Sequence, residues 1–133
     1  MLGKIDHIGI AVKDIEKTIL FFKEVFGAEL VRKSIVEEQK LISGMLSLGN
    51  TKVELMQSLD NQGVIEKFIQ TKGEGVHHIS IQVENLDRVK EQLELRDIKV
   101  SSELAFKGSK IAFIHPKSTF GILIEILERS SGV

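Results

Sequence analysis

An internal repeat constrains the fold of this chain more than any other feature of its sequence. His7 and His78 are 71 positions apart, and Glu54 and Glu125 are separated by the same 71 positions. The stretches around them also match, residues 5–12 with 77–83 and residues 53–56 with 124–127. Two such modules usually pack about a pseudo-twofold axis, so equivalent positions are expected to approach one another.

The histidines of the repeat stand in strand-like runs. Successive side chains of a strand point to opposite faces, so His7 shares a face with Gly9, and His78 with Ser80. The residues that alternate with them are isoleucines and valines. We therefore expect the β-branched face to pack on a helix, while the face with the histidines lines a cavity.

Length and composition limit the class of protein. The 133 residues are expected to form one domain over 1–133, with module one at about 4–58, a connector at about 59–75 and module two at about 76–130. No segment approaches the ~20 apolar residues of a membrane span, and a signal-peptide core is absent, so a cytoplasmic location is expected. The net charge of −1 favours neither nucleic acid nor a membrane as partner. The lack of cysteine excludes disulfides and thiolate chemistry.

In the first module a helix is framed by strands. Asp14 is a suitable N-cap and Gly27 a suitable stop for this helix. Its apolar stripe comprises Ile15, Ile19, Phe22 and Phe26. The expected elements are strands at 5–12, 28–34, 40–48 and 51–56, a helix at about 15–26 and a short connecting helix near 64–70.

The second module repeats this order. Asn85 is the expected N-cap of a helix that turns Leu86, Val89 and Leu93 inward. A turn is expected at residues 115–118, because Pro116 cannot continue a strand ladder. The expected strands are 77–83, 99–104, 110–115 and about 121–128. The predicted fold class is therefore α+β, with two repeated βαβββ modules.

Two imidazoles and two carboxylates together would form a donor set for one divalent ion. Four ligands leave two positions of an octahedral ion for substrate oxygens, which favours Ni or Co, with Zn as the alternative. Two buried carboxylates brought together without a cation would repel each other, so a purely structural role for both is unfavourable. The sequence predicts His7, Glu54, His78 and Glu125 as metal ligands.

Other polar residues carry weaker signals. His77 has the opposite strand parity from His78 and is expected to be structural. His115 precedes the proline and is expected in a turn or beside the ligands rather than among them. Three lysines near turns of the second module are candidates to meet an anionic substrate, although each one taken singly fits a solvated surface: Lys107, Lys110 and Lys117.

With its paired βαβββ modules and its His…Glu…His…Glu order, the chain resembles the vicinal-oxygen-chelate superfamily, which has the glyoxalase/bleomycin-resistance/dioxygenase-like fold. Glyoxalase I, one of its families, uses two His and two Glu on Ni, Co or Zn to isomerise the glutathione–methylglyoxal hemithioacetal. The resemblance implies the same four ligands here, with Glu125 as the leading base and Glu54 as its opposite-face counterpart. Methylmalonyl-CoA epimerase, a second family with ligands at the same positions, is resembled in residues 48–52, 75–78 and 115–118.

One position favours the first of these two families. Some epimerases carry a catalytic glutamate in the strand after a Glu-Gln pair, whereas after Glu38 and Gln39 that position is Ser43 here. Together with the complete set of two histidines and two glutamates, the resemblance therefore implies a lactoylglutathione lyase, which forms S-lactoylglutathione in methylglyoxal detoxification, with methylmalonyl-CoA epimerase as the alternative. The expected partners are a small thiol adduct or thioester and a second copy of the chain in a homodimer. Whether the site lies within one chain or across the dimer stays open.

Two further classes are less consistent with the sequence. An iron-dependent ring-cleaving dioxygenase needs two histidines, one carboxylate and positions open to oxygen, and a second carboxylate would occupy one of these positions. A non-enzymatic antibiotic-binding protein shares the fold, does not need the metal ligands and uses aromatic-lined grooves. This chain has neither tyrosine nor tryptophan to line such a groove.

Overall fold

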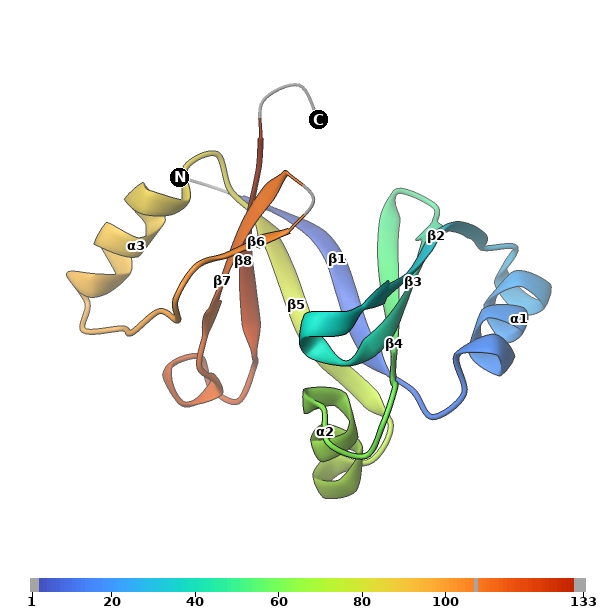
Figure 1. Cartoon of the computed structure of the whole chain (residues 1–133). Coiled ribbons are helices and arrows are strands. Elements are labelled where there is room, and N and C mark those ends of the chain that lie inside the picture. Colours follow the sequence, from blue (N-terminus) through green and yellow to red (C-terminus); the bar gives the residue numbers. More distant parts are fainter. Residues whose placement is uncertain (1–2, 107, 131–133) are drawn as a thin grey trace. The chain divides into compact units, whose positions relative to one another are not determined.

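The computed structural model describes residues 3–106 and 108–130 (Figure 1). The chain divides into two compact units. The first unit is His7–His77, and the second unit comprises Met1–Asp6 with His78–Val133. Helices and strands follow one another in the predicted order within each unit, which confirms the α+β class and the repeated module. That the whole chain behaves as one domain stays a prediction.

The first unit is built on a sheet with the strand order β2-β3-β4-β1. Its elements are β1 (Lys4–Ala11, in this unit from His7), α1 (Ile15–Phe26), β2 (Glu29–Val36), the 3₁₀ turn η1 (Glu37–Gln39), β3 (Leu41–Leu48), β4 (Thr51–Ser58) and α2 (Val64–Lys72). Strand β1 pairs with β4 in parallel, and β3 pairs antiparallel with both β2 and β4. A parallel pair requires a long connection between its strands, and α1, β2 and β3 make up this connection.

Helix α1 has the boundaries that its caps predict. The Asp14 side chain accepts a hydrogen bond from the backbone N–H of Lys17 at 3.1 Å, and Gly27 ends the helix in the left-handed conformation, at φ 69°. The inner face of α1 packs Ile15 and Ile19 into the core of the unit. The predicted stripe is wrong at its end, because Phe26 is 58% exposed. Phe26 packs instead on the rings of Phe21 and Phe22, on the outer side of the helix.

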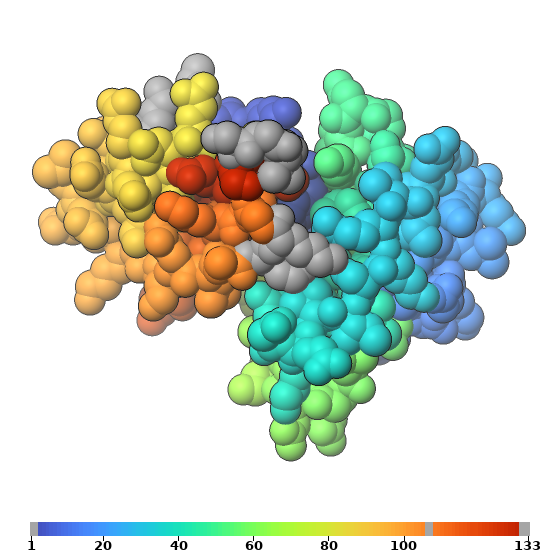
Figure 2. Space-filling view, turned by 45° about the horizontal axis from the view of Figure 1, so that its top comes forward, coloured from blue at the N-terminus to red at the C-terminus, as the bar shows by residue number. Residues whose placement is uncertain are grey.

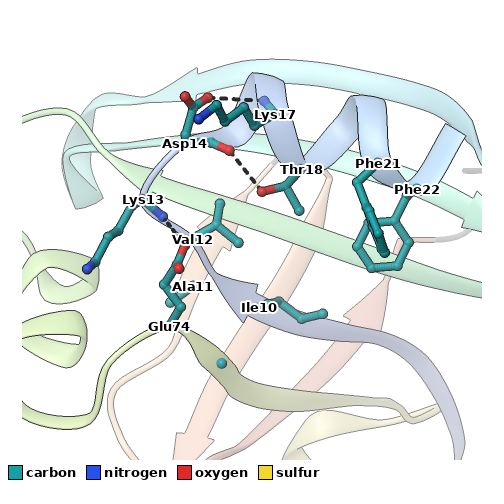
Figure 3. Close-up of a pocket in the computed structure, with 11 residues that line it drawn as sticks. Ile10, Ala11, Val12, Lys13, Asp14, Lys17, Thr18, Phe21, Phe22 and Glu74 are labelled. Carbon is teal, nitrogen blue, oxygen red and sulfur yellow. Dashed lines mark hydrogen bonds between the residues drawn. The ribbon is translucent and has the colours of Figure 1, made fainter. Parts of the chain in front are cut away.

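The outer side of α1 carries exposed apolar side chains. Figure 2 draws the residues of this helix in blue. Four of these apolar side chains are more than half exposed: Leu20, Phe21, Val25 and Phe26. A pocket beside the helix start is lined by β1, α1 and the segment before β5, and the hydrogen bonds of the Asp14 cap lie at its rim (Figure 3). None of the four predicted metal ligands lines this pocket.

The second unit has the strand order β5-β8-β7-β6. Its elements are β5 (Gly75–Gln82, in this unit from His78), α3 (Leu86–Glu94), β6 (Leu104–Phe106), β7 (Ser109–Ile114), the 3₁₀ turn η2 (Pro116–Ser118) and β8 (Ile124–Arg129). Strand β5 pairs with β8 in parallel, as β1 pairs with β4. The Asn85 side chain caps α3 by accepting from the backbone N–H of Arg88 at 3.1 Å. Leu86 of this helix packs on Ala112 and Ile126 of the sheet.

The predicted strand 99–104 is wrong over most of its length. Only an isolated bridge between Val100 and Ile114 remains there, and β6 starts at Leu104. The Ser101 side chain explains the interruption, because its Oγ accepts a hydrogen bond from the backbone N–H of Phe113 at 2.8 Å. A side-chain acceptor of this kind competes with the backbone ladder. The other predicted strands are confirmed to within a few residues at their ends.

Among the described residues, no helix is long and apolar enough to cross a membrane. The predicted cytoplasmic location stays a prediction.

Candidate metal centre

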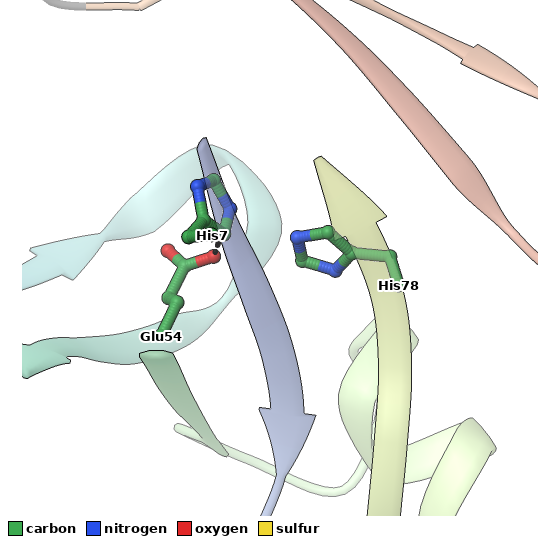
Figure 4. A group of neighbouring side chains, drawn as sticks. All are labelled: His7, Glu54 and His78. Atoms are coloured by element: carbon green, nitrogen blue, oxygen red, sulfur yellow. Dashed lines mark ion pairs between the residues drawn. The ribbon is translucent and has the colours of Figure 1, made fainter. Parts of the chain in front are cut away.

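The first unit brings His7 and Glu54 together. In the parallel pairing of β1 with β4, Gly9 is the register partner of Glu54, so the side chains of His7 and Glu54 lie on the same face. The Nε2 atom of His7 lies 3.4 Å from Oε1 of Glu54, and His7 is 6% exposed (Figure 4). The predicted strand parity is therefore confirmed for this pair.

Ser43 fixes the second oxygen of Glu54. The Ser43 hydroxyl donates a hydrogen bond to Oε2 of Glu54 at 2.7 Å, and Ser43 is only 3% exposed. The two oxygens of this carboxylate thus have different partners, one towards Ser43 and the other towards His7. Sequence reasoning interpreted Ser43 only as a missing base and did not identify this contact. The signal was available in the strand alternation, because Ser43 and Glu54 lie on one face of the β3–β4 pair.

The second unit repeats the arrangement of strands. His78 lies on β5, Glu125 lies on β8, and the two residues are 4% and 7% exposed. Ser80 is the register partner of Glu125, as Gly9 is of Glu54. Figure 4 draws the His78 side chain on β5. Each unit therefore holds one buried histidine and one glutamate on the same face of a parallel strand pair.

Two buried hydroxyls differ from Ser43 in having no hydrogen-bond partner among the described residues. They are the hydroxyls of Ser80, which is 0% exposed, and of Ser34 on β2. Leaving a buried hydroxyl unsatisfied costs roughly 1–3 kcal/mol of stability. Ser80 is the register partner of Glu125, a predicted metal ligand, so its unsatisfied hydroxyl lies next to the candidate site.

His77 has a different environment from its neighbour His78. Its ring contacts Phe68 of α2 edge-on, with 5.0 Å between the ring centroids, and Lys72 lies over the same Phe68 ring. Burial lowers the pKa of His77 below its usual value; the charge of Glu54 acts in the raising direction and that of Lys72 in the lowering direction. A neutral ring packed on a helix agrees with the structural role predicted for His77.

We expect His77→Ala to reduce the free energy of unfolding by roughly 1–2 kcal/mol, because the contact with Phe68 is lost. Metal content and activity should stay at the wild-type values. Denaturant unfolding and metal analysis of the purified variant would measure both effects. His78→Ala is the matched variant, and a metal-loaded His78→Ala protein beside a metal-free His77→Ala protein would reverse the assignment of the two histidines.

The lysines predicted to meet a substrate lie in different environments. Lys107 is outside the described residues. Phe113 of β7 is the register partner of Glu125, and Lys110 is three positions before Phe113. The Lys110 side chain therefore points to the face of the sheet opposite to that of Glu125. Its Nζ atom is 4.0 Å from the carboxylate of Glu128. Lys117 is exposed in η2.

His115 and Lys52 complete the polar residues that bear on the site. His115 is exposed, and its Nδ1 accepts a hydrogen bond from the backbone N–H of Lys117 at 3.1 Å, which places it in the turn rather than among the ligands. Lys52 was not singled out from the sequence. It is exposed, it is the register partner of His7, and it shares a face of β4 with Glu54.

The donor atoms in each unit are of the type that binds a divalent cation. Imidazole nitrogens and carboxylate oxygens suit Ni, Co or Zn, and they are present as His7 and Glu54 in the first unit and as His78 and Glu125 in the second. Buried carboxylates are costly unless they are paired or coordinate a metal, so a bound cation would offset this cost.

This chain belongs to the glyoxalase/bleomycin resistance protein/dioxygenase superfamily, whose family model matches residues 6–113. The predicted superfamily is thereby confirmed.

Within this superfamily the chain is similar to methylmalonyl-CoA epimerases. It is 35% identical over 129 residues to the mitochondrial methylmalonyl-CoA epimerase of Homo sapiens, a match that covers 94% of this chain and 73% of the relative. The crystal structure of the Mycobacterium tuberculosis epimerase matches at 30% identity and a TM-score of 0.89, over 96% of this chain and 88% of the other. A Streptomyces coelicolor epimerase in complex with 2-nitronate-propionyl-CoA matches at 28% identity and a TM-score of 0.91, over 100% and 98% of the two chains.

These comparisons overturn the predicted lactoylglutathione lyase activity. A lactoylglutathione lyase of Arabidopsis thaliana matches at 30% identity over 127 residues, but the match covers only 43% of that relative. The prediction of a lyase in methylglyoxal detoxification was therefore wrong, and an isomerase acting on a CoA thioester is better supported. The error had two sources. Ser43 was interpreted as the loss of an epimerase base, and the complete set of two histidines and two glutamates was interpreted as favouring a lyase. In the structure Ser43 is a hydrogen-bond donor to Glu54, so its presence gives no argument for a lyase.

Proposed function

We propose that this protein is a metal-dependent epimerase of methylmalonyl-CoA or of a closely related 2-carboxyacyl-CoA thioester. The observation that carries the proposal is the similarity over the whole chain to an epimerase solved with a CoA thioester analogue. The donor types that this chemistry needs are present in both units: buried His7 with part-buried Glu54 in the first, and buried His78 and Glu125 in the second.

We propose His7, Glu54, His78 and Glu125 as the ligands of one divalent ion, with Ni or Co preferred and Zn as the alternative. When bound, the ion supplies a Lewis acid that makes the proton next to the thioester carbonyl more acidic. Four protein ligands would leave two positions for substrate oxygens, which suits a six-coordinate ion better than the four-coordinate preference of Zn.

The two glutamates are proposed to move the proton. Epimerisation breaks a C–H bond on one face of the α-carbon and forms a new C–H bond on the other face, so a base on one side and an acid on the other are required. Glu125 is the leading base: its carboxylate takes the α-proton, and the electron pair of the broken C–H bond moves into the thioester group, which carries the negative charge until a proton is returned. Glu54 is the counterpart that delivers a proton to the opposite face, and the pair exchanges roles in the reverse direction. The Ser43 hydrogen bond keeps the Glu54 carboxylate in one orientation during this transfer.

A homodimer is part of the proposal. Strand β2 stands at the end of the strand order of its unit, and its side chains Val31 and Ile35 are 58% and 60% exposed. Together with the exposed apolar side of α1, this edge would be covered by a second copy of the chain.

The direct test of the proposed activity offers two substrates to one metal-loaded preparation. With methylmalonyl-CoA in deuterated water, we expect the α-proton to be replaced by deuterium. Mass spectrometry would measure this exchange. With the glutathione–methylglyoxal hemithioacetal, we expect no S-lactoylglutathione. Formation of S-lactoylglutathione without α-exchange of the CoA ester would reject the epimerase proposal.

A further inference from the structure

Ser80 lies directly beside Glu125 in the second unit. The two residues are register partners on the parallel strands β5 and β8, which run side by side in Figure 1, so their side chains point to the same face. Ser80 is completely buried, and its hydroxyl has no hydrogen-bond partner among the described residues. His78, two residues before Ser80, shares this face as well.

The first unit shows what a nearby serine does for its glutamate, although it comes from a different strand. Gly9 occupies the position of Ser80 there, and it has no hydroxyl to offer to Glu54. The hydroxyl comes instead from Ser43 on β3, whose bond to Glu54 is 2.7 Å long.

The position equivalent to Ser43 in the second unit holds no hydroxyl. Ser43 pairs with Met56, two residues after Glu54, and Ile111 of β7 pairs with Leu127, two residues after Glu125. Each glutamate of the candidate centre therefore has one serine close by, contributed by a different strand in each unit.

We propose that Ser80 is a positioning residue, which donates a hydrogen bond to the carboxylate of Glu125 when the centre holds its metal ion. A carboxylate offers about four lone-pair sites, so Glu125 accepts this bond in addition to its other contacts. The bond would fix the orientation of Glu125 in the way that Ser43 fixes Glu54. This inference rests on the proposed metal site and does not depend on the identity of the substrate.

The test measures the affinity for Ni²⁺ by calorimetry on the full chain. Loss of a residue that orients a metal ligand typically lowers affinity about 10–100-fold, and we expect a reduction of this size for Ser80→Ala. Because Ser80 acts through Glu125, the double variant Ser80→Ala/Glu125→Gln should bind no more weakly than Glu125→Gln alone. Ser34→Ala removes the other buried hydroxyl without a partner and should bind Ni²⁺ like the wild-type protein.

Thermal unfolding of the metal-free proteins separates this role from damage to the fold. Ser80→Ala removes an unsatisfied buried group, so it should melt at the same temperature as the wild type or a few degrees higher, while its affinity for Ni²⁺ falls. Wild-type affinity in Ser80→Ala, or a further loss in the double variant, would overturn the proposal. A wild-type protein that fails to bind Ni²⁺ would overturn it together with the metal site. The variants could show the expected Ni²⁺ affinities while the wild-type protein fails to exchange the α-proton of methylmalonyl-CoA. This outcome would support the positioning role of Ser80 and reject only the proposed epimerase activity.

Discussion

Removal of divalent metal from the purified protein is expected to abolish exchange of the α-proton of methylmalonyl-CoA. Without the Lewis acid, the carboxylates of Glu54 and Glu125 must abstract a proton from a carbon acid that is far weaker than they are. A bound ion would also offset part of the cost of burying its carboxylate ligands, and this contribution is lost with the metal. Dialysis against a chelator, followed by the deuterium exchange assay, would measure the loss.

Restoration of activity by metal is the control for this experiment. Ni²⁺ or Co²⁺ should restore more activity than Zn²⁺, because a six-coordinate ion leaves two positions for the substrate when four protein ligands are bound. Mg²⁺ should restore little, since it binds imidazole poorly. Full activity in the chelated protein would contradict the four-ligand site and the interpretation of the 71-residue repeat.

Much of the fold could be predicted because local signals agree with the tertiary structure. The Asp14 cap, the Gly27 stop and the spacing of Ile15 and Ile19 define α1, and the structure has all of these features. The alternation around His7 placed this residue on one face with Gly9, and in the structure Gly9 is the register partner of Glu54. Such predictions succeed when one short stretch contains all the information that decides the structure.

Side-chain contacts that the hydrophobic pattern does not specify could not be predicted. Phe26 fits the helical stripe, but its ring packs on Phe21 and Phe22 rather than in the core. The strand before Leu104 is interrupted by the hydrogen bond from the Phe113 backbone to Ser101, twelve residues away. The bond between Ser43 and Glu54 requires the register of β3 on β4, which a single sequence does not specify.

The substrate could not be predicted from the ligand set for a chemical reason. The lyase and the epimerase reactions both remove a proton from the carbon next to a carbonyl group, so both need the same imidazoles and carboxylates. The difference lies in the group that the substrate carries, and His7, Glu54, His78 and Glu125 do not report on that group. Ser43 was used to choose together with the complete ligand set, and its use assumed that a base must stand there. Its hydrogen bond to Glu54 shows that a donor at this position supports a glutamate elsewhere on the same face.

Glu125→Gln is expected to lower the rate of α-proton exchange by about 10²–10⁴-fold, the usual effect of removing a general base. The amide keeps the size of the side chain and one oxygen donor, so the affinity for Ni²⁺ should fall much less than the rate. Glu54→Gln should also slow exchange, but it additionally disturbs the hydrogen bond with Ser43 and the contact with His7. Calorimetry with Ni²⁺ and single-turnover exchange would separate the two effects for each variant.

Glu94→Gln is the matched control, because Glu94 is an exposed carboxylate at the end of α3 and its removal tests only the change of charge. It should retain both the rate and the affinity of the wild-type protein. A distinct result is expected for the two directions of the reaction. If Glu125 and Glu54 stand on opposite faces of the α-carbon, each glutamine variant should remove the proton from one epimer much more slowly than from the other, and the two variants should have opposite preferences. Equal slowing of both epimers in both variants would exclude the assignment of one glutamate to each face.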